Sequence, residues 1–228
     1  MNELLQTLID LDTNLLLWFN SMHSPFWDNF MTLYTHRFIW IPFYASFLYV
    51  MFRNFPWKAN LTCLLVITLI VLICDQTASG LLKPMIGRLR PANLDNPISP
   101  MVHIVNGYRG GRYGFPSSHA ANAWSMAFFA HYLGRRNKLT VFLFCWALVM
   151  SYTRIYLGVH YPGDILVGII IGFLTASLCY YIFQLARGED THRFKPAAGN
   201  LKQGYIPIMV GIASIWVMVG ASGIMLLM

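Results

Sequence analysis

The chain has 228 residues, of which 57% are hydrophobic and only 11% are charged. A soluble domain carries about 25% charged residues, so the composition excludes a disordered chain and argues against a soluble globular domain. The net charge of +7 would suggest nucleic acid as the partner of a soluble protein. In a chain with long apolar runs, the same excess points to the lipid bilayer first and to anionic phosphate second. We therefore expect a membrane protein with no nucleic-acid partner.

Residues 1–36 are predicted to form an N-terminal segment at the membrane surface. Apolar residues recur there at helical spacing, but Glu3, Asp12 and Asn14 interrupt the run. This pattern favours an amphipathic helix lying in the interface over a helix that crosses the bilayer. The apolar positions are Leu4, Leu5, Leu8, Leu11, Leu15 and Phe19.

A helix needs about 20 apolar residues to cross a bilayer, and six later runs meet or approach this length. The sequence therefore predicts an all-α polytopic membrane bundle of about six transmembrane helices. The main bundle would span residues 37–186, followed by a cytoplasmic loop at 187–204 and an accessory helix at 205–228. The six runs are Phe38–Phe52, Leu61–Leu82, Ala120–Leu133, Leu139–Leu157, Ile165–Leu185 and Tyr205–Met228.

Basic residues in alternate connections predict the orientation, because cytoplasmic connections are enriched in Lys and Arg. The residues that mark the cytoplasmic face are Arg53, Lys58, Arg135, Arg136, Lys138, Arg187, Arg193, Lys195 and Lys202. Six further cations fall on the opposite face, against the rule. They are Lys83, Arg88, Arg90, Arg109, Arg112 and Arg154. A binding site for an anion on the outer face is the obvious local reason.

Three polar clusters lie at the outer ends of the predicted helices, in residues 83–91, 115–119 and 153–164. Taken alone, each has an ordinary explanation: cations at helix ends contact lipid headgroups, a single histidine forms structural hydrogen bonds, and an aspartate charges a first turn. Together they bring two histidines, an aspartate and three strong cations to one depth. We interpret this combination as a reaction centre.

The cations suit phosphoryl transfer, in which negative charge spreads over the oxygens of the transferred group. Lys83, Arg90 and Arg154 would form the cradle for that charge. Lys83 and Arg90 are seven residues apart and would share a helix face if the helix continues between them. The hydroxyl of Ser117 and the backbone N–H of Ser118 lie at the expected start of a helix, where anions bind readily.

The remaining polar groups suggest nucleophilic chemistry. His160 and Asp164 are four residues apart, so they would be neighbours on a helix. A carboxylate that accepts a hydrogen bond from Nδ1–H would leave Nε2 free to attack phosphorus. His119 would then protonate the leaving oxygen. This scheme is a phosphohistidine mechanism that requires neither a metal nor another cofactor.

Other polar residues leave two interpretations open. Asp75 lies within a predicted span, where it is either a functional group or a structural hydrogen-bonding group between helices. Arg88, Arg109 and Arg112 would either bind a second phosphate or a sugar headgroup, or face solvent.

The three clusters resemble the three-part signature of the type 2 phosphatidic acid phosphatase superfamily, in spacing and in order, over about residues 75–170. The matching motifs are Lys83-x6-Arg90-Pro91, Pro116-Ser117-Ser118-His119 and Thr153-Arg154-x5-His160-x3-Asp164. The family usually has Gly at the position of Ser118 and Ser at that of Thr153. The resemblance implies an α-helical bundle and a metal-independent reaction on a lipid phosphate. In that scheme the nucleophile is His160, its orienting partner is Asp164, the general acid is His119, and the phosphate ligands are Lys83, Arg90, Ser117, Ser118 and Arg154.

For a compact chain of this kind, the resemblance also suggests an enzyme of the bacterial inner membrane whose site faces the periplasm. Undecaprenyl diphosphate is the first expected substrate, and lipid A phosphate or phosphatidylglycerophosphate are the alternatives. A vanadium-dependent haloperoxidase is disfavoured because such enzymes are soluble. A non-catalytic lipid-binding or lipid-transport protein would tolerate the loss of His119, His160 or Asp164, and none is missing. The sequence does not predict the oligomeric state.

Overall fold

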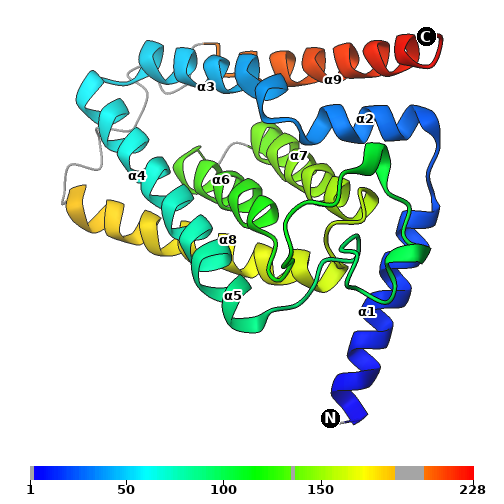
Figure 1. Ribbon diagram of the computed structural model, residues 1–228. Helices are drawn as coiled ribbons and strands as arrows, with labels where there is room; N and C mark the ends of the chain where they lie inside the picture. Colours follow the sequence, from blue (N-terminus) through cyan, green and yellow to red (C-terminus); the bar gives the residue numbers. More distant parts are fainter. Residues whose placement is uncertain (1–2, 135–136, 188–202) are drawn as a thin grey trace.

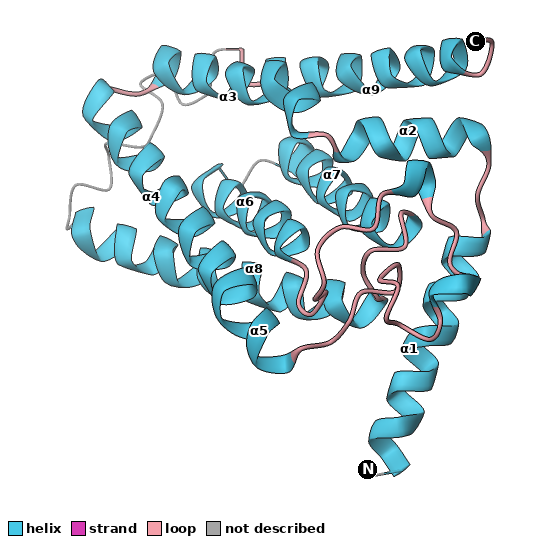
Figure 2. Cartoon of the chain, in the orientation of Figure 1, coloured by secondary structure: helices cyan, strands magenta, loops and turns pink. Residues whose placement is uncertain are grey.

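The computed structural model describes residues 3–134, 137–187 and 203–228, and all regular structure in these ranges is helical (Figures 1 and 2). The predicted all-α class is therefore confirmed. The helices are α1 (Glu3–Ser21), α2 (Pro25–Thr35), α3 (Ile41–Asn54), α4 (Trp57–Asp75), α5 (Lys83–Ile86), α6 (Ser118–Gly134), α7 (Asn137–Tyr156), α8 (Pro162–Arg187) and α9 (Ile206–Met225). Most of the predicted loop 187–204, with Arg193, Lys195 and Lys202, lies outside the described ranges, as do Arg135 and Arg136.

In the described chain, four helices are long and apolar enough to cross a membrane. They are Trp57–Ile86, Lys138–Tyr156, Pro162–Leu185 and Ile206–Met225. In the first of them, a π-helical segment, Gln76–Leu82, joins α4 directly to α5. The two other predicted spans correspond to α3, with 14 residues, and α6, with 17 residues. Helix α3 alone is shorter than a full crossing requires, whereas α6 lies at the lower limit of about 17 residues.

Within residues 1–36, predicted as the N-terminal interfacial segment, α2 packs against the bundle. Ser24 caps this helix by accepting a hydrogen bond from the backbone N–H of Trp27 at 3.4 Å. Phe30 and Tyr34 are buried in one cluster with Trp40 of the following turn. Figure 1 shows α2 and α3 following one another along α9, and both helices contact α9. The partners of this apolar face come from distant helices, so the local sequence could not reveal them.

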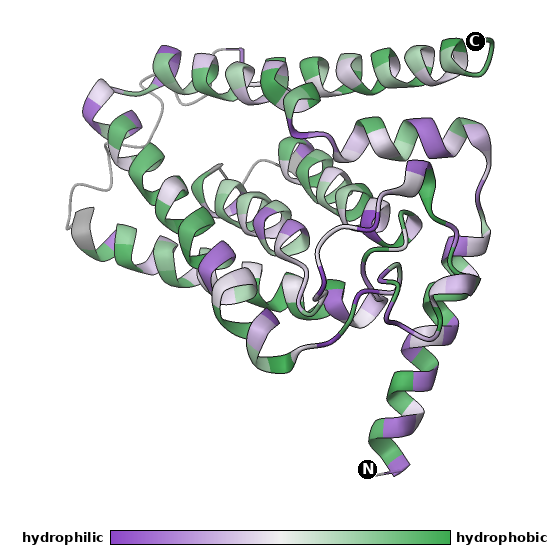
Figure 3. Ribbon diagram, in the orientation of Figure 1, coloured by the Kyte–Doolittle hydropathy of each residue, from purple (hydrophilic) through white to green (hydrophobic). Residues whose placement is uncertain are grey.

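Helix α1 reaches out from the bundle and keeps most of its apolar side chains exposed, whereas Leu16 and Asn20 are buried near its C-terminal end. Figure 3 shows polar and apolar residues alternating along α1, whereas α9 is almost entirely apolar. The exposed apolar side chains of α1 include Leu4, Leu5, Leu8, Leu11 and Leu15. This exposure agrees with the amphipathic pattern read from the sequence.

Two glycines of α8 bring α8 against α6 and thereby build the floor of the site. A Cβ atom at Gly168 would lie 2.6 Å from the carbonyl oxygen of Ser117, and one at Gly172 would lie 2.6 Å from that of Ala121. Only glycine allows the two backbones to approach this closely, as small residues do between membrane helices. The close packing places the start of α6 beside the start of α8, where the Ser117 N–H donates to the Asp164 carbonyl at 2.9 Å.

Candidate active site

His160 and Asp164 form a buried pair where the chain passes from α7 to α8. The His160 side chain is 1% exposed and that of Asp164 is 0% exposed. His160 Nδ1 lies 3.2 Å from Asp164 Oδ2, which also accepts the Tyr161 backbone N–H at 3.0 Å. Pro162 begins α8, as predicted. His160 precedes this helix, and the Arg154 carbonyl, which accepts the His160 N–H at 3.2 Å, fixes its backbone.

The second ring nitrogen of His160 is available for chemistry. His160 Nε2 is buried and forms no hydrogen bond with any described residue. Burial, followed by the charges of Arg90, Arg154 and Lys83, lowers the pKa of His160 well below its ordinary value of 6.5. The imidazole is therefore neutral at pH 7, and its Nε2 lone pair is free because Asp164 holds Nδ1–H. A buried, unpaired acceptor facing three cations is the arrangement that an attacking nitrogen needs.

Arg90 belongs to a loop, so the condition for a helix face shared with Lys83 is not met. The helix that contains Lys83 ends at Gly87, which adopts a left-handed φ of 65°. Lys83 and Arg90 consequently do not share a helix face. Arg90 is instead held by its Nε, which donates to the Tyr113 carbonyl at 3.1 Å, while its Nη1 is buried without a hydrogen-bond partner among the described residues.

Arg154 is the last-turn cation of α7, and its side chain is almost completely buried. Its Nη1 donates to Thr35 Oγ1 at 2.8 Å and its Nη2 donates to the Tyr108 hydroxyl at 3.3 Å. Its Nε is buried and has no hydrogen-bond partner in the described chain. Arg90 and Arg154 thus each keep a free donor in the site while other contacts fix their orientation, which is the preorganisation that charge stabilisation requires.

Lys83 and the first residues of α6 complete the candidate active site. Lys83 Nζ donates to Ser118 Oγ at 3.4 Å and to Ser79 Oγ at 3.2 Å. Ser117 is fully buried, and its hydroxyl accepts the Ala120 N–H at 3.4 Å as a cap of α6. His119 is exposed in the first turn of α6 and lies within electrostatic reach of His160 and the cations. The three sequence clusters therefore meet at one place, with His119 on its open side.

The three remaining arginines, for which a second anion site was one predicted alternative, each contact other groups of the protein. Arg88 binds the carboxylates of both Asp164 and Asp12. Arg109 Nη1 donates to the Ala92 carbonyl at 2.6 Å and so ties two loop segments together. Arg112 is 64% exposed and pairs with Asp95 at 3.3 Å, on the surface. Existing contacts engage these cations, a feature that charge counting along a sequence cannot reveal.

Four residues that the sequence analysis did not select help to build the site. Asp12 binds Arg88, Thr35 and Tyr108 orient Arg154, and Gly114 packs on the histidine–aspartate pair. A Cβ atom at Gly114 would lie 3.0 Å from Asp164 Oδ2. Of these, only Asp12 carried a sequence signal, as a charge interrupting an apolar helix face.

Asp75, the ionisable residue within the second predicted span, is exposed at the end of α4. Its carboxylate attracts Lys83 electrostatically, and it forms no interhelical hydrogen bond in the described chain. The structural interpretation of this residue, as a hydrogen-bonding group between helices, is therefore not supported.

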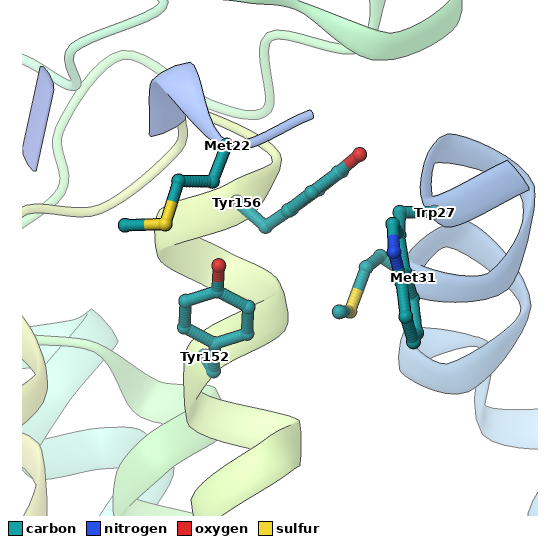
Figure 4. A pocket seen from close by; sticks show the side chains of 5 residues that line it. All are labelled: Met22, Trp27, Met31, Tyr152 and Tyr156. Carbon is teal, nitrogen blue, oxygen red and sulfur yellow. The ribbon is translucent and has the colours of Figure 1, made fainter. Parts of the chain in front are cut away.

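A separate pocket of about 300 Å³ lies between the α1–α2 connection and α7 (Figure 4). Trp27 and Met31 of α2 lie opposite two tyrosines of α7, and Met22 comes from the α1–α2 connection. The lining residues are Met22, Trp27, Met31, Tyr152 and Tyr156. None of the predicted site residues lines this pocket. Within the described ranges, no group of three or more His, Cys, Asp or Glu side chains is arranged to hold a metal ion.

Comparison with known proteins agrees with this geometry. Residues 60–187 match the model of the PAP2 superfamily, which is more than half of the chain. The chain is 44% identical to a lipid A 4'-phosphatase of Bacteroides thetaiotaomicron, over 93% of this chain and 95% of that protein. It is 34% identical to a lipid A 4'-phosphatase of Porphyromonas gingivalis, over 81% of this chain and 78% of that protein.

Solved structures show the same fold. Aquifex aeolicus LpxE superposes with a TM-score of 0.57 at 23% identity, over 75% of this chain and 95% of that one. A PAP2-type phosphatidylglycerolphosphate phosphatase from Bacillus subtilis superposes with a TM-score of 0.56 at 24% identity, over 82% of this chain and 90% of that one. The family resemblance read from the three motifs is thus confirmed: the chain belongs to the PAP2 superfamily and is a membrane lipid phosphatase.

Proposed function

We propose that this phosphatase removes the 4'-phosphate of lipid A, a phosphorylated and acylated disaccharide. The observation that carries the proposal is the 44% identity, over nearly the full length of both chains, to a protein named lipid A 4'-phosphatase. The first substrate expected from the sequence, undecaprenyl diphosphate, has weaker support. The undecaprenyl-diphosphatase of Sulfolobus acidocaldarius is 29% identical over only 63% of this chain. Lipid A phosphate, one of the two alternatives expected from the sequence, is therefore the main proposal.

The reaction proceeds in two displacements at phosphorus. His160 Nε2 attacks the phosphate, a nitrogen–phosphorus bond forms, and the bond from phosphorus to the sugar oxygen breaks. His119 protonates that oxygen, which leaves as a hydroxyl group. Water then attacks the phosphohistidine, giving a proton to His119, and inorganic phosphate departs with His160 regenerated. Asp164 holds the Nδ1–H of His160 throughout and stabilises its positive charge in the intermediate.

The cations stabilise the negative charge of the phosphoryl group during these two displacements. The free donors of Arg90 and Arg154 and the ammonium of Lys83 face the transferred group. Ser117 and Ser118 contribute the N-terminal end of α6, whose backbone N–H groups favour an anion. A bound phosphate dianion also offsets the cations near His119, which favours the protonated form that the first displacement uses.

The membrane arrangement that we propose assigns each long helix, or pair of successive helices, to one crossing. The chain crosses six times, with α2 and α3 together as the first crossing, α4 and α5 as the second, and α6, α7, α8 and α9 as the others. Helix α1 lies in the outer interface. Arg53 and Lys58 mark the cytoplasmic end, opposite the site, in agreement with the bias of cytoplasmic loops toward Lys and Arg. The site therefore faces the periplasm of a bacterial inner membrane.

The test is phosphate release by the purified protein in detergent from a panel of lipid phosphates, with and without EDTA. The panel contains lipid A, undecaprenyl diphosphate and phosphatidylglycerophosphate at equal mole fraction in the micelle. We expect the highest kcat/KM with lipid A, loss of its 4'-phosphate only, and the same rate in EDTA. Faster turnover of either other lipid would contradict the proposed substrate, and inactivation by EDTA would contradict the metal-free mechanism.

A further inference from the structure

The carboxylate of Asp12, on helix α1, contacts two residues that support the active site. Asp12 Oδ2 lies 2.8 Å from Arg88 Nη2, and Asp12 Oδ1 accepts the Gly163 backbone N–H at 2.7 Å. A Cβ atom at Gly163 would lie 2.8 Å from Asp12 Oδ2, so the carboxylate fits directly against the first turn of α8. Asp12 lies outside residues 60–187, the part of the chain that matches the family model.

Arg88 connects this carboxylate to the proposed nucleophile. Its Nη1 donates to Asp164 Oδ1 at 3.0 Å, and its guanidinium group lies over the Tyr161 ring at 3.7 Å from the centroid. The other oxygen of Asp164 holds His160 Nδ1. Four side chains thus form one continuous chain from α1 to His160. The planar guanidinium group can bind two carboxylates in fixed directions, which a lysine ammonium cannot do.

The burial of this chain gives the Asp12–Arg88 pair more influence than a surface ion pair has. The side chains of Asp12 and Arg88 are only 16% and 23% exposed. Solvent screens such partly buried charges less than exposed ones. In Asp12→Asn, Arg88 would keep one carboxylate partner instead of two, and the single amide oxygen could not serve both Arg88 and the Gly163 N–H as the two carboxylate oxygens do. Both changes loosen the residues that orient Asp164.

We propose that Asp12 is a positioning residue for catalysis, which acts through Arg88 and the first turn of α8 on the orientation of Asp164 and His160. This inference rests on the proposed function of His160 as nucleophile. Asp12 touches neither the cations of the phosphate cradle nor His160. Its removal is therefore expected to lower kcat and to leave KM unchanged.

The test compares Asp12→Asn with Asp10→Asn, a matched change on the same helix. Asp10 is exposed and accepts a hydrogen bond only from Gln6 of its own helix in the described chain. We expect Asp12→Asn to lower kcat about tenfold, the effect typical of outer partners that orient a reactive group, and Asp10→Asn to match the wild type. The loss should be equal for lipid A in micelles and for p-nitrophenyl phosphate, which has no lipid tail. A loss confined to lipid A, or a change in KM alone, would overturn the proposal.

Variants at Arg88 test whether Asp12 acts through Arg88. They also keep the proposal testable if Asp12→Asn does not fold. Arg88→Lys keeps the charge but cannot bind both carboxylates in fixed directions, so it should show the same loss of kcat. In Arg88→Gln, the further change Asp12→Asn should cost less kcat than it does in the wild type, whereas fully additive losses would contradict coupling through Arg88. Failure of the proposed function is distinguishable: the wild type would then release no phosphate from lipid A. Failure of this inference would show as an active wild type matched by Asp12→Asn and Arg88→Lys.

Discussion

The His160→Asn variant is expected to release phosphate from lipid A at least about a thousandfold more slowly than the wild type, as enzymes do when they lose a covalent nucleophile. Asparagine keeps a polar group of similar size beside Asp164 but offers no nitrogen lone pair to phosphorus. The phosphate cradle is untouched, so binding of the substrate should persist. The measurement is kcat and KM for purified variants in detergent, with the thermal unfolding midpoint as a check on folding.

The matched control is His131→Asn, the same chemical change on α6. His131 Nδ1 lies 3.2 Å from Thr140 Oγ1, away from the residues of the site. This variant should keep the wild-type kcat. If His160→Asn retained more than about a tenth of wild-type kcat, a loss far smaller than removal of a nucleophile causes, His160 would not be the nucleophile.

The Arg90→Gln variant is expected to lower kcat/KM about a hundredfold, the usual effect of removing one donor that stabilises transition-state charge. It should also change the pH dependence. Arg90 is the largest electrostatic cause, after burial, of the lowered pKa of His160. Loss of its charge raises that pKa, so His160 becomes protonated and inactive at a higher pH. The acid limb of the kcat/KM profile should therefore move toward neutral pH.

Arg112→Gln is the control for this change, because Arg112 is exposed and pairs with Asp95 at the surface. The substrate ionises identically in all assays, so a difference between profiles reports on the enzyme. An Arg90→Gln profile that coincides with the wild type, or that moves to lower pH, would contradict the proposed coupling between Arg90 and His160. An equal loss in both variants would contradict a specific place for Arg90 in the cradle.

The sequence predicted the parts of the site that depend on local spacing. The four-residue separation of His160 and Asp164, with Pro162 starting a helix between them, led to the pairing that the structure contains. The anion site inferred from the basic residues on the outer face stays a prediction. The pairing of His160 with Asp164 depends on residues close together in the chain, which is why it needed no knowledge of long-range packing.

The parts that could not be predicted depend on distant contacts. Arg88 was expected to bind an anion or face solvent, but Asp12 approaches it from a helix 76 residues earlier in the chain. The packing of α2 could not be predicted for the same reason, because the partners of α2 come from α7 and α9. The helix face that Lys83 and Arg90 would share in a continuous helix does not form, because the chain turns at Gly87. Neither the charge of a residue nor its periodicity reveals which partner it meets.

The stereochemical course at phosphorus tests the central claim most directly. The substrate is lipid A whose 4'-phosphate is a thiophosphate made chiral with two oxygen isotopes. Hydrolysis is run in water that carries the third isotope, and the configuration of the released thiophosphate is determined. Each in-line displacement inverts phosphorus, so a phosphohistidine formed and then hydrolysed gives overall retention. We predict retention. Inversion would mean that water attacks the lipid phosphate directly, and it would contradict His160 as the nucleophile.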